Sequence, residues 1–169
     1  MFFTADHGLA VGEHGLMGKQ NLFDHSVRVP FIARGPKFKA GQRLATPIYL
    51  QDVMPTSLAL AGAADPKSPA FKSLLPVATG ETTDLHGPIY GAYRMLQRSI
   101  TQDGFKLILY PEVPKRLLFN LKTDPEEMHD LSMDPAQQDR QRQLFHGLIK
   151  LQNEANDPLE LDPKAYWSM

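Results

Sequence analysis

The chain has 169 residues, with 18 basic and 19 acidic side chains and a formal net charge of −1. This balance excludes a polybasic nucleic-acid-binding surface, so we expect no nucleic acid partner. The chain has no cysteine, which excludes disulfides and thiolate metal ligands. No apolar run approaches the roughly 20 residues of a membrane span and no signal peptide opens the chain, so we expect no membrane partner.

The first third of the chain alternates short apolar runs with glycine-rich and proline-rich loops. Met1–Thr4 is typical of a buried strand, and residues 5–24 form a loop rich in Gly and His. A second buried strand is predicted over residues 28–33, with Pro30 at its start, where a missing N–H is tolerated. These runs indicate the end of a parallel α/β layer.

A helix is predicted over residues 52–61. Asp52 stands at the N-cap position, Pro55 in the first turn, and Gly62 at the C-terminal stop. Residues 63–87 contain repeated proline and predict mostly loop.

The second half of the chain predicts an antiparallel sheet of about four strands. Asp103-Gly104 between two of the runs is a strong signal for a two-residue hairpin turn. The predicted strands are Ile89–Met95, Arg98–Gln102, Phe105–Tyr110 and Leu117–Leu121.

A charged amphipathic helix follows over residues 135–156, with Leu144, Leu148 and Leu151 on one stripe. The tail after it contains proline and is expected to be irregular, with Tyr166 and Trp167 available to dock it. Composition therefore predicts an α/β chain of two domains: residues 1–82, the end of a parallel-sheet layer, and residues 83–169, a small α+β unit.

The strand end at Asp6-His7-Gly8 carries two side chains that suit divalent metals. A carboxylate oxygen and an imidazole nitrogen are accepted by ions from Ca²⁺ and Mg²⁺ to Mn²⁺ and Zn²⁺. Neighbouring residues on a regular strand point to opposite faces, so both reach one ion only if the chain turns there, which Gly8 permits. An Asp-His pair in a surface turn is the alternative explanation.

Several charged residues follow in the loop. Lys19 is a candidate point charge for sulfate or phosphate, although a lysine in a loop is usually a solvated surface group. His14 is a candidate proton donor, with Glu13 near it in sequence. Arg28 is expected to pair with a carboxylate for a structural purpose.

Taken together, the motifs of residues 2–132 resemble the sulfatase family within the alkaline-phosphatase-like superfamily. The first block reads T-A-D-H-G-x-x-x-G-E-H-G-x-x-x-K, and the second reads F-D-H-S-V-R-V-P-F-I. The later matches are Asp52-Val53-Met54-Pro55-Thr56 through Gly62, Arg98 to Tyr110, Leu118-Phe119-Asn120-Leu121, Asp124-Pro125-Glu126-Glu127 and Asp130-Leu131.

The resemblance implies roles for individual residues. Asp6 and His7 would be ligands of a divalent metal, usually Ca²⁺ in this family, with Mg²⁺ or Mn²⁺ as substitutes. Lys19 would bind the sulfate and stabilise charge as the S–O bond breaks. Candidates for the leaving-group pocket are His86, Tyr90, Tyr93 and Arg94, although a structural role is the simpler reading of each.

The sequence departs from the family at the nucleophile, which is a formylglycine made from Cys or Ser in a C/S-x-P-x-R motif. The chain has no Cys, and none of its serines stands in that motif. Two further metal carboxylates of the family, from an earlier strand, have no counterpart here. We therefore expect a C-terminal fragment of a sulfuric ester hydrolase that binds metal weakly and is inactive alone. The parent enzyme is expected to be exported.

Two other functions stay open at this stage. A phosphonate or phosphodiester hydrolase of the same superfamily would use Asp6, His7 and Lys19 to bind another tetrahedral anion. A non-enzymatic binding module, formed by the antiparallel sheet and its helix, is the alternative from a different class. Exposed sheet edges would also favour a homo-oligomer.

Overall fold

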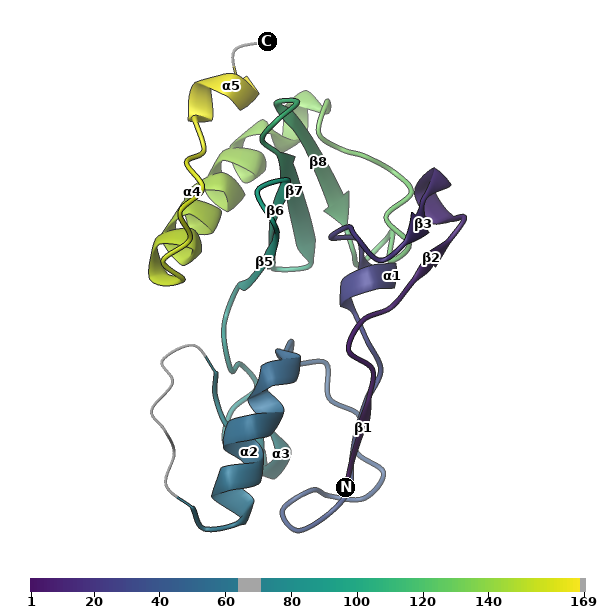
Figure 1. The fold of residues 1–169 in the computed structure, drawn as a ribbon, viewed down its shortest axis with the longest axis vertical. Helices are drawn as coiled ribbons and strands as arrows, with labels where there is room; N and C mark the ends of the chain where they lie inside the picture. The colour runs from purple at the N-terminus through teal and green to yellow at the C-terminus, as the bar shows by residue number, and fades with distance from the viewer. Residues whose placement is uncertain (64–70, 168–169) are drawn as a thin grey trace. The chain divides into compact units, whose positions relative to one another are not determined.

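The computed structural model describes residues 1–63 and 71–167 (Figure 1). The chain forms two compact units, one of residues 1–6 with 30–87 and one of residues 7–29 with 88 onwards. Residues 7–29, which the sequence division assigns to the first domain, thus group with the second unit. The division at residues 82 and 83 stays a prediction. None of the helices in the described ranges has the length and apolar character needed to cross a membrane.

The strands of the first unit pair antiparallel. Strand β1 (Phe2–Thr4) runs against β4 (Phe31–Ala33), with Phe3 opposite Ile32. The predicted parallel layer is therefore not present in the described residues, since the two strands of this sheet run in opposite directions. Phe2 stacks on Phe31, while Phe3 and Ile32 are 58% and 57% exposed, so the expected buried strands are covered on one face only.

The predicted helix in the first unit is confirmed. A 3₁₀ turn, η2 (Leu50–Asp52), leads into α2 (Val53–Leu60), and Gly62 follows with a left-handed φ of 67°. Asp52 occupies the predicted N-cap position of α2, but its side chain makes no capping hydrogen bond there. Its buried carboxylate instead accepts the backbone N–H groups of Tyr49 at 2.8 Å and Lys72 at 2.9 Å, which joins two segments of this unit.

A second short helix, α3 (Leu75–Thr79), lies where the sequence predicts loop. Its signals are present, since Pro76 occupies the first turn and Gly80 ends the helix with a φ of 87°. Buried residues Leu74 and Val77 pack with Leu85, forming the small core of this unit. Part of the predicted loop, residues 64–70, lies outside the described residues.

The second unit contains the predicted four-stranded antiparallel sheet. Strands β5 (Ile89–Tyr93), β6 (Gln97–Gln102), β7 (Phe105–Tyr110) and β8 (Lys115–Asn120) are neighbours in chain order. Asp103 and Gly104, with φ of 56° and 84°, form the predicted turn between β6 and β7.

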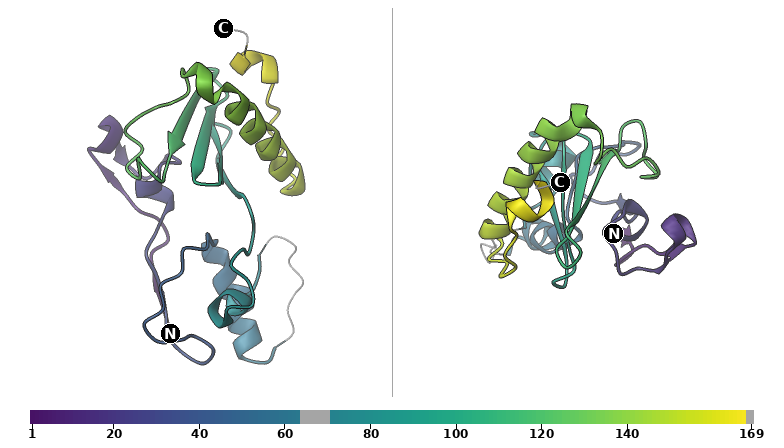
Figure 2. Two further views of the ribbon diagram at one scale, coloured as in Figure 1. Left: turned by 180° about the vertical axis from the view of Figure 1, so that it is seen from behind. Right: turned by 90° about the horizontal axis from the view of Figure 1, so that it is seen from above.

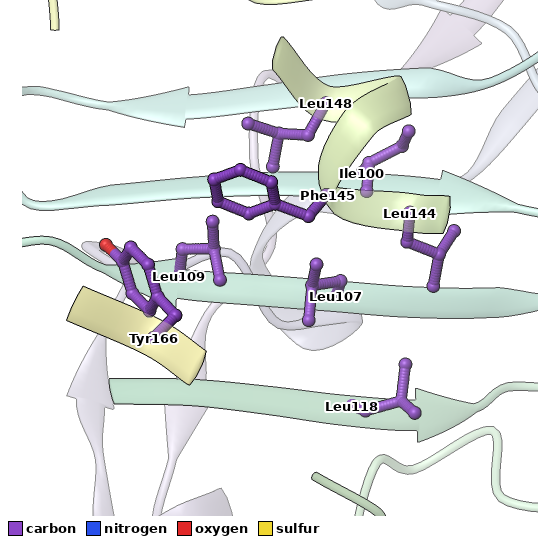
Figure 3. Packing of buried hydrophobic residues seen from close by; sticks show 8 residues of the cluster. All are labelled: Ile100, Leu107, Leu109, Leu118, Leu144, Phe145, Leu148 and Tyr166. Atoms are coloured by element: carbon purple, nitrogen blue, oxygen red, sulfur yellow. The ribbon is translucent and has the colours of Figure 1, made fainter. Parts of the chain in front are cut away.

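One face of this sheet is covered by the predicted C-terminal helix. The 3₁₀ turn η3 (Pro135–Gln137) leads into α4 (Gln138–Glu154), which lies along the sheet in both views of Figure 2. The tail, which was expected to be irregular, forms a short helix, α5 (Pro163–Trp167), and Tyr166 docks it as expected. The core on this face (Figure 3) consists of Ile100, Leu107, Leu109, Leu118, Leu144, Phe145, Leu148 and Tyr166.

Residues 7–29 lie over the other face of the sheet (Figure 2). They contain β2 (Ala10–Val11), η1 (Glu13–Gly15), β3 (Met17–Gly18) and α1 (Asp24–Val27). Side chains alternate along each strand, so the residues between those of the first core point to this side. The resulting second cluster consists of Leu22, Phe23, Ile108, Leu117 and Phe119.

A buried ion pair fastens the end of α4 to the sheet. The Arg98 guanidinium donates to both carboxylate oxygens of Asp157, at 2.6 and 2.8 Å, and the Tyr90 hydroxyl donates to the same carboxylate. The Arg98 hydrogen bond is the main reason that the pKa of Asp157 lies well below its usual range. Burial and the neighbouring carboxylate raise the pKa of Tyr90.

Truncating the helix side of the core should destabilise the chain. Leu148 is fully buried, so Leu148→Ala is expected to lower the free energy of unfolding by about 2–5 kcal/mol. Urea denaturation followed by circular dichroism measures this change. Val113 is 65% exposed, and Val113→Ala should stay within about 0.5 kcal/mol of the parent. Equal effects of the two substitutions would contradict the described core.

The Asp157 carboxylate should make the free energy of unfolding depend on pH in the acidic range. Because its pKa is lowered in the folded chain, the unfolded chain binds the proton first, and stability falls as the pH drops below about 4. Asp157→Asn should cost about 3 kcal/mol at pH 7 and flatten the pH dependence between pH 5 and pH 2.5. Urea titrations across this range test it, with Asp139→Asn, a side chain 91% exposed, as the control.

Candidate active site

The glycine of the Asp6-His7-Gly8 motif lies directly against the short helix α1. The Gly8 N–H donates to the Ser26 carbonyl at 2.8 Å. A Cβ placed on Gly8 would lie 1.9 Å from the His25 carbonyl oxygen, which no side chain can accept. Position 8 therefore needs glycine because the backbone of α1 occupies the space of a side chain.

His7 lies between a backbone carbonyl and the predicted anion-binding lysine. Its Nδ1 is 2.8 Å from the Gly8 carbonyl oxygen, and its Nε2 is 2.5 Å from Lys19 Nζ. A neutral ring must carry its proton on Nδ1 to satisfy the carbonyl, which leaves the Nε2 lone pair facing the Lys19 ammonium group. The structure thus brings together His7 and Lys19, twelve residues apart in the chain.

This tautomer fits a metal-ligating histidine. Such residues commonly donate their other ring N–H to a carbonyl or carboxylate, which orients the coordinating nitrogen. Asp6, the preceding residue, is exposed. Among residues 1–63 and 71–167, no three His, Cys, Asp or Glu side chains gather into a group that would hold a metal ion. Asp6 belongs to the first unit and His7 to the second, and their joint role as metal ligands stays a prediction.

His14 stacks in an aromatic group beside a cavity. Its ring lies 4.0 Å from the Phe23 ring, nearly parallel, and 5.5 Å from the His25 ring. Its backbone is left-handed, with φ of 53°. Burial, followed by the charge of His14, lowers the pKa of His25, whose Nε2 is buried without a hydrogen-bond partner among the described residues.

The cavity beside these rings has a volume of about 240 Å³. The Glu13 carboxylate at its wall accepts the Val11 N–H at 2.6 Å, and this hydrogen bond is the main cause of its lowered pKa. Arg28 pairs with Asp24 at 3.5 Å, which confirms the expected structural ion pair. The cavity is lined by Glu13, His14, Asp24, His25, Arg28, Pro125, Glu126, Glu127 and Met128.

The residues predicted for the leaving-group pocket lie in different surroundings. His86 belongs to the first unit, where its buried ring bonds the Asp52 carboxylate at 2.8 Å. Arg94, in the second unit, is exposed and lies 5.8 Å from the Tyr93 ring centre. Tyr90 donates to Asp157. Their contacts are structural, and their roles toward a substrate stay predictions.

Sequence reasoning missed a buried charge cluster centred on Lys106. Lys106 is 2% exposed and its ammonium group bonds Asp24 Oδ1, and Glu127 Oε1 lies 2.7 Å away. Burial raises the pKa of Glu127, and the Lys106 charge opposes that rise. The signal was a lysine inside the apolar run Phe105–Tyr110, because a charge on a buried strand requires a partner.

Comparison with known families identifies the chain. Residues 12–154 match the family model described as N-sulphoglucosamine sulphohydrolase, C-terminal. The chain belongs to the sulfatase family. It is 31% identical over 173 residues to N-acetylglucosamine-6-O-sulfatase from Bacteroides thetaiotaomicron, which covers 94% of this chain and 31% of that protein.

Other known proteins also match most of the chain. The chain is 31% identical over 158 residues to the multifunctional alkaline phosphatase superfamily protein PehA from Trinickia caryophylli, covering 80% of this chain and 30% of that one. A protein solved with its substrate D-glucosamine-2-N,6-O-disulfate has a TM-score of 0.82 and 28% identity, covering 95% of this chain and 36% of that chain. This sulfatase chain thus spans about a third of the length of these relatives.

Adding a methyl group at position 8 should disturb the site. Gly8→Ala forces the Gly8 segment away from α1 and is expected to cost about 1–3 kcal/mol, as overpacking does. Urea denaturation measures the cost, and the Lys19–His7 contact can be followed by the ring nitrogen NMR signals of His7. Leu9→Ala, at a neighbouring side chain 54% exposed, is the control and should leave both readouts unchanged.

Proposed function

We propose that this chain supplies part of the active site of a sulfate-ester hydrolase. In this proposal Lys19 binds the sulfate group, and Asp6 and His7 contribute ligands to a divalent cation, with Ca²⁺ as the ion that the family resemblance implies. The observation that carries the proposal is the His7–Lys19 pair, in which a ring nitrogen and an ammonium group face each other at 2.5 Å.

The chemistry of this pair suits a sulfate ester. Lys19 is an exposed, compact point charge on a flexible stem, suited to an oxygen of a tetrahedral anion. The carbonyl of Gly8 fixes the His7 tautomer, so the Nε2 lone pair, which faces Lys19 in this structure, would bind a cation once the Lys19 ammonium group turns to the anion. A divalent cation held by His7 and Asp6 would supply electrophilic stabilisation of the negative charge that develops on the leaving group.

The remaining parts of such a site would come from residues outside this chain. The family's nucleophile motif is absent from the sequence, and Asp6 and His7 alone cannot complete a Ca²⁺ shell. We therefore infer that the 169 residues contribute the metal ligands Asp6 and His7 and the sulfate-binding side chain of Lys19, while the rest of a longer enzyme supplies the nucleophile. A sulfated amino sugar is the substrate class suggested by the named substrates of two relatives.

A second candidate is hydrolysis of a phosphonate or phosphodiester. The His7–Lys19 pair suits any tetrahedral anion, and one relative is named as a multifunctional protein of the alkaline phosphatase superfamily. The two candidates share the same residues and differ only in the transferred group.

Metal binding by the chain alone tests the ligand assignment. With two ligands, Ca²⁺ is expected to bind with a dissociation constant of about 1 mM or weaker, the low end for protein calcium sites. Isothermal titration should show this weak binding, and His7→Ala or Asp6→Asn should abolish it. His146→Ala, at an exposed position of α4, is the matched control. Retention of Ca²⁺ binding in both site variants would refute the assignment.

Turnover tests the proposed reaction. The purified chain should hydrolyse no aryl sulfate. A chimera in which it replaces the matched third of the N-acetylglucosamine-6-O-sulfatase should be active, and Lys19→Ala should lower its kcat/KM by about 10²–10³-fold. Lys150→Ala, a side chain 78% exposed, is the control. Faster turnover of a phosphonate than of a sulfate ester by the chimera would favour the second candidate.

A further inference from the structure

The Lys106 ammonium group lies on the sheet face that meets residues 7–29. Lys106 is the second residue of β7, pairs with Phe119 on β8, and is 2% exposed. Three acceptors surround its nitrogen: Asp24 Oδ1, the Leu22 carbonyl at 3.2 Å, and Glu127 Oε1 at 2.7 Å. The contacts with Asp24 and Leu22 are hydrogen bonds and the contact with Glu127 is an ion pair, so the ammonium group has all three of these partners at this one location.

Glu127 also contacts this segment directly, and Gln97 is a further side chain that holds it. Glu127 Oε2 accepts the Asp24 N–H at 2.6 Å, and buried Gln97 accepts the Leu22 N–H at 3.1 Å. Glu127 adopts a left-handed φ of 57°, an uncommon backbone conformation for a non-glycine residue. Residues 22–24 are therefore fixed by one side chain from each of two strands and by one from the loop after β8.

The fixed segment leads directly into the helix that contacts Gly8. Helix α1 begins at Asp24, its Ser26 carbonyl accepts the Gly8 N–H, and its His25 carbonyl fills the space of a Gly8 side chain. Gly8 in turn presents its own carbonyl to His7 Nδ1. A continuous series of polar contacts thus runs from β7 through α1 to the ring that faces Lys19.

We propose that Lys106, with Glu127, is a positioning residue for His7. In this proposal neither group contacts the substrate or the metal. Their ion pairs set where α1 lies, α1 sets where Gly8 lies, and the Gly8 carbonyl sets the tautomer and orientation of the His7 ring. This inference deepens the proposed function and rests on it for the role of His7.

The chemistry of the cluster supports positioning over mere stability. Buried ion pairs often contribute little net stability, because desolvation offsets their attraction. They do restrict geometry, since every charge must keep its partners in the low-dielectric interior. A methionine at position 106 would fill the same space without fixing Asp24, so the two effects can be separated experimentally.

The test uses the full chain and needs neither metal nor turnover, so its failure differs from failure of the proposed function. In Lys106→Met, amide hydrogen exchange at Gly8 should become at least tenfold faster, and the ¹⁵N signals of the His7 ring should move toward a mixture of tautomers. Amides of β6 and β7 should keep the rates of the parent. Lys115→Met, at an exposed lysine on β8, is the control and should change neither readout.

A milder variant keeps the test decisive if Lys106→Met does not fold. Glu127→Gln retains an oxygen for the Asp24 N–H but replaces the carboxylate oxygen that faces Lys106 with an amide NH2 group. It leaves the Lys106–Asp24 contact in place, so it should produce the same changes at Gly8 and His7 to a smaller degree. Unchanged Gly8 exchange in the folded variants would overturn the proposal. Equal acceleration at Gly8 and across the sheet would also overturn it, because that result describes general destabilisation.

Discussion

The burial of one ammonium group, that of Lys106, constrains how the second unit of this sulfatase chain packs. Lys106 brings a positive charge to the interior of the sheet, where it is stable only beside Asp24 and Glu127. Meeting that requirement ties α1 and the loop after β8 to the sheet. The apolar cluster around Ile108 then packs on the same face, so charge and hydrophobic burial place residues 7–29 together.

The two faces of the sheet make different kinds of contact because side chains alternate between the faces along each strand. Leu107 and Leu109 point to α4 and build the larger core, while Lys106 and Ile108 point to the segment that carries the candidate site. One face therefore supplies most of the apolar burial. The other face joins the sheet to Gly8 and His7 through hydrogen bonds and ion pairs, which are directional and suit a site that requires defined geometry.

Much of the second unit could be predicted from sequence, and less of the first. The Asp103-Gly104 turn, the four strands and α4 could be predicted because they depend on the periodicity and turn preferences of residues adjacent in sequence. The parallel layer was predicted wrongly because apolar runs do not encode strand direction, and β1 pairs antiparallel with β4. Helix α3 was missed although Pro76 and Gly80 mark its ends, since its five residues are too few to show a helical period.

By itself the sequence determined the sulfatase motifs, the candidate metal ligands Asp6 and His7, the hairpin and the amphipathic helix. Each of these depends on residues that are close together in the chain. Only the tertiary structure decided that His7 Nε2 faces Lys19, that α1 takes the place of a side chain at Gly8, and that Lys106 pairs with Asp24, 82 residues away. These contacts join residues distant in sequence. They form when strand pairing and burial fix which side chains share a space, and no local pattern specifies that outcome.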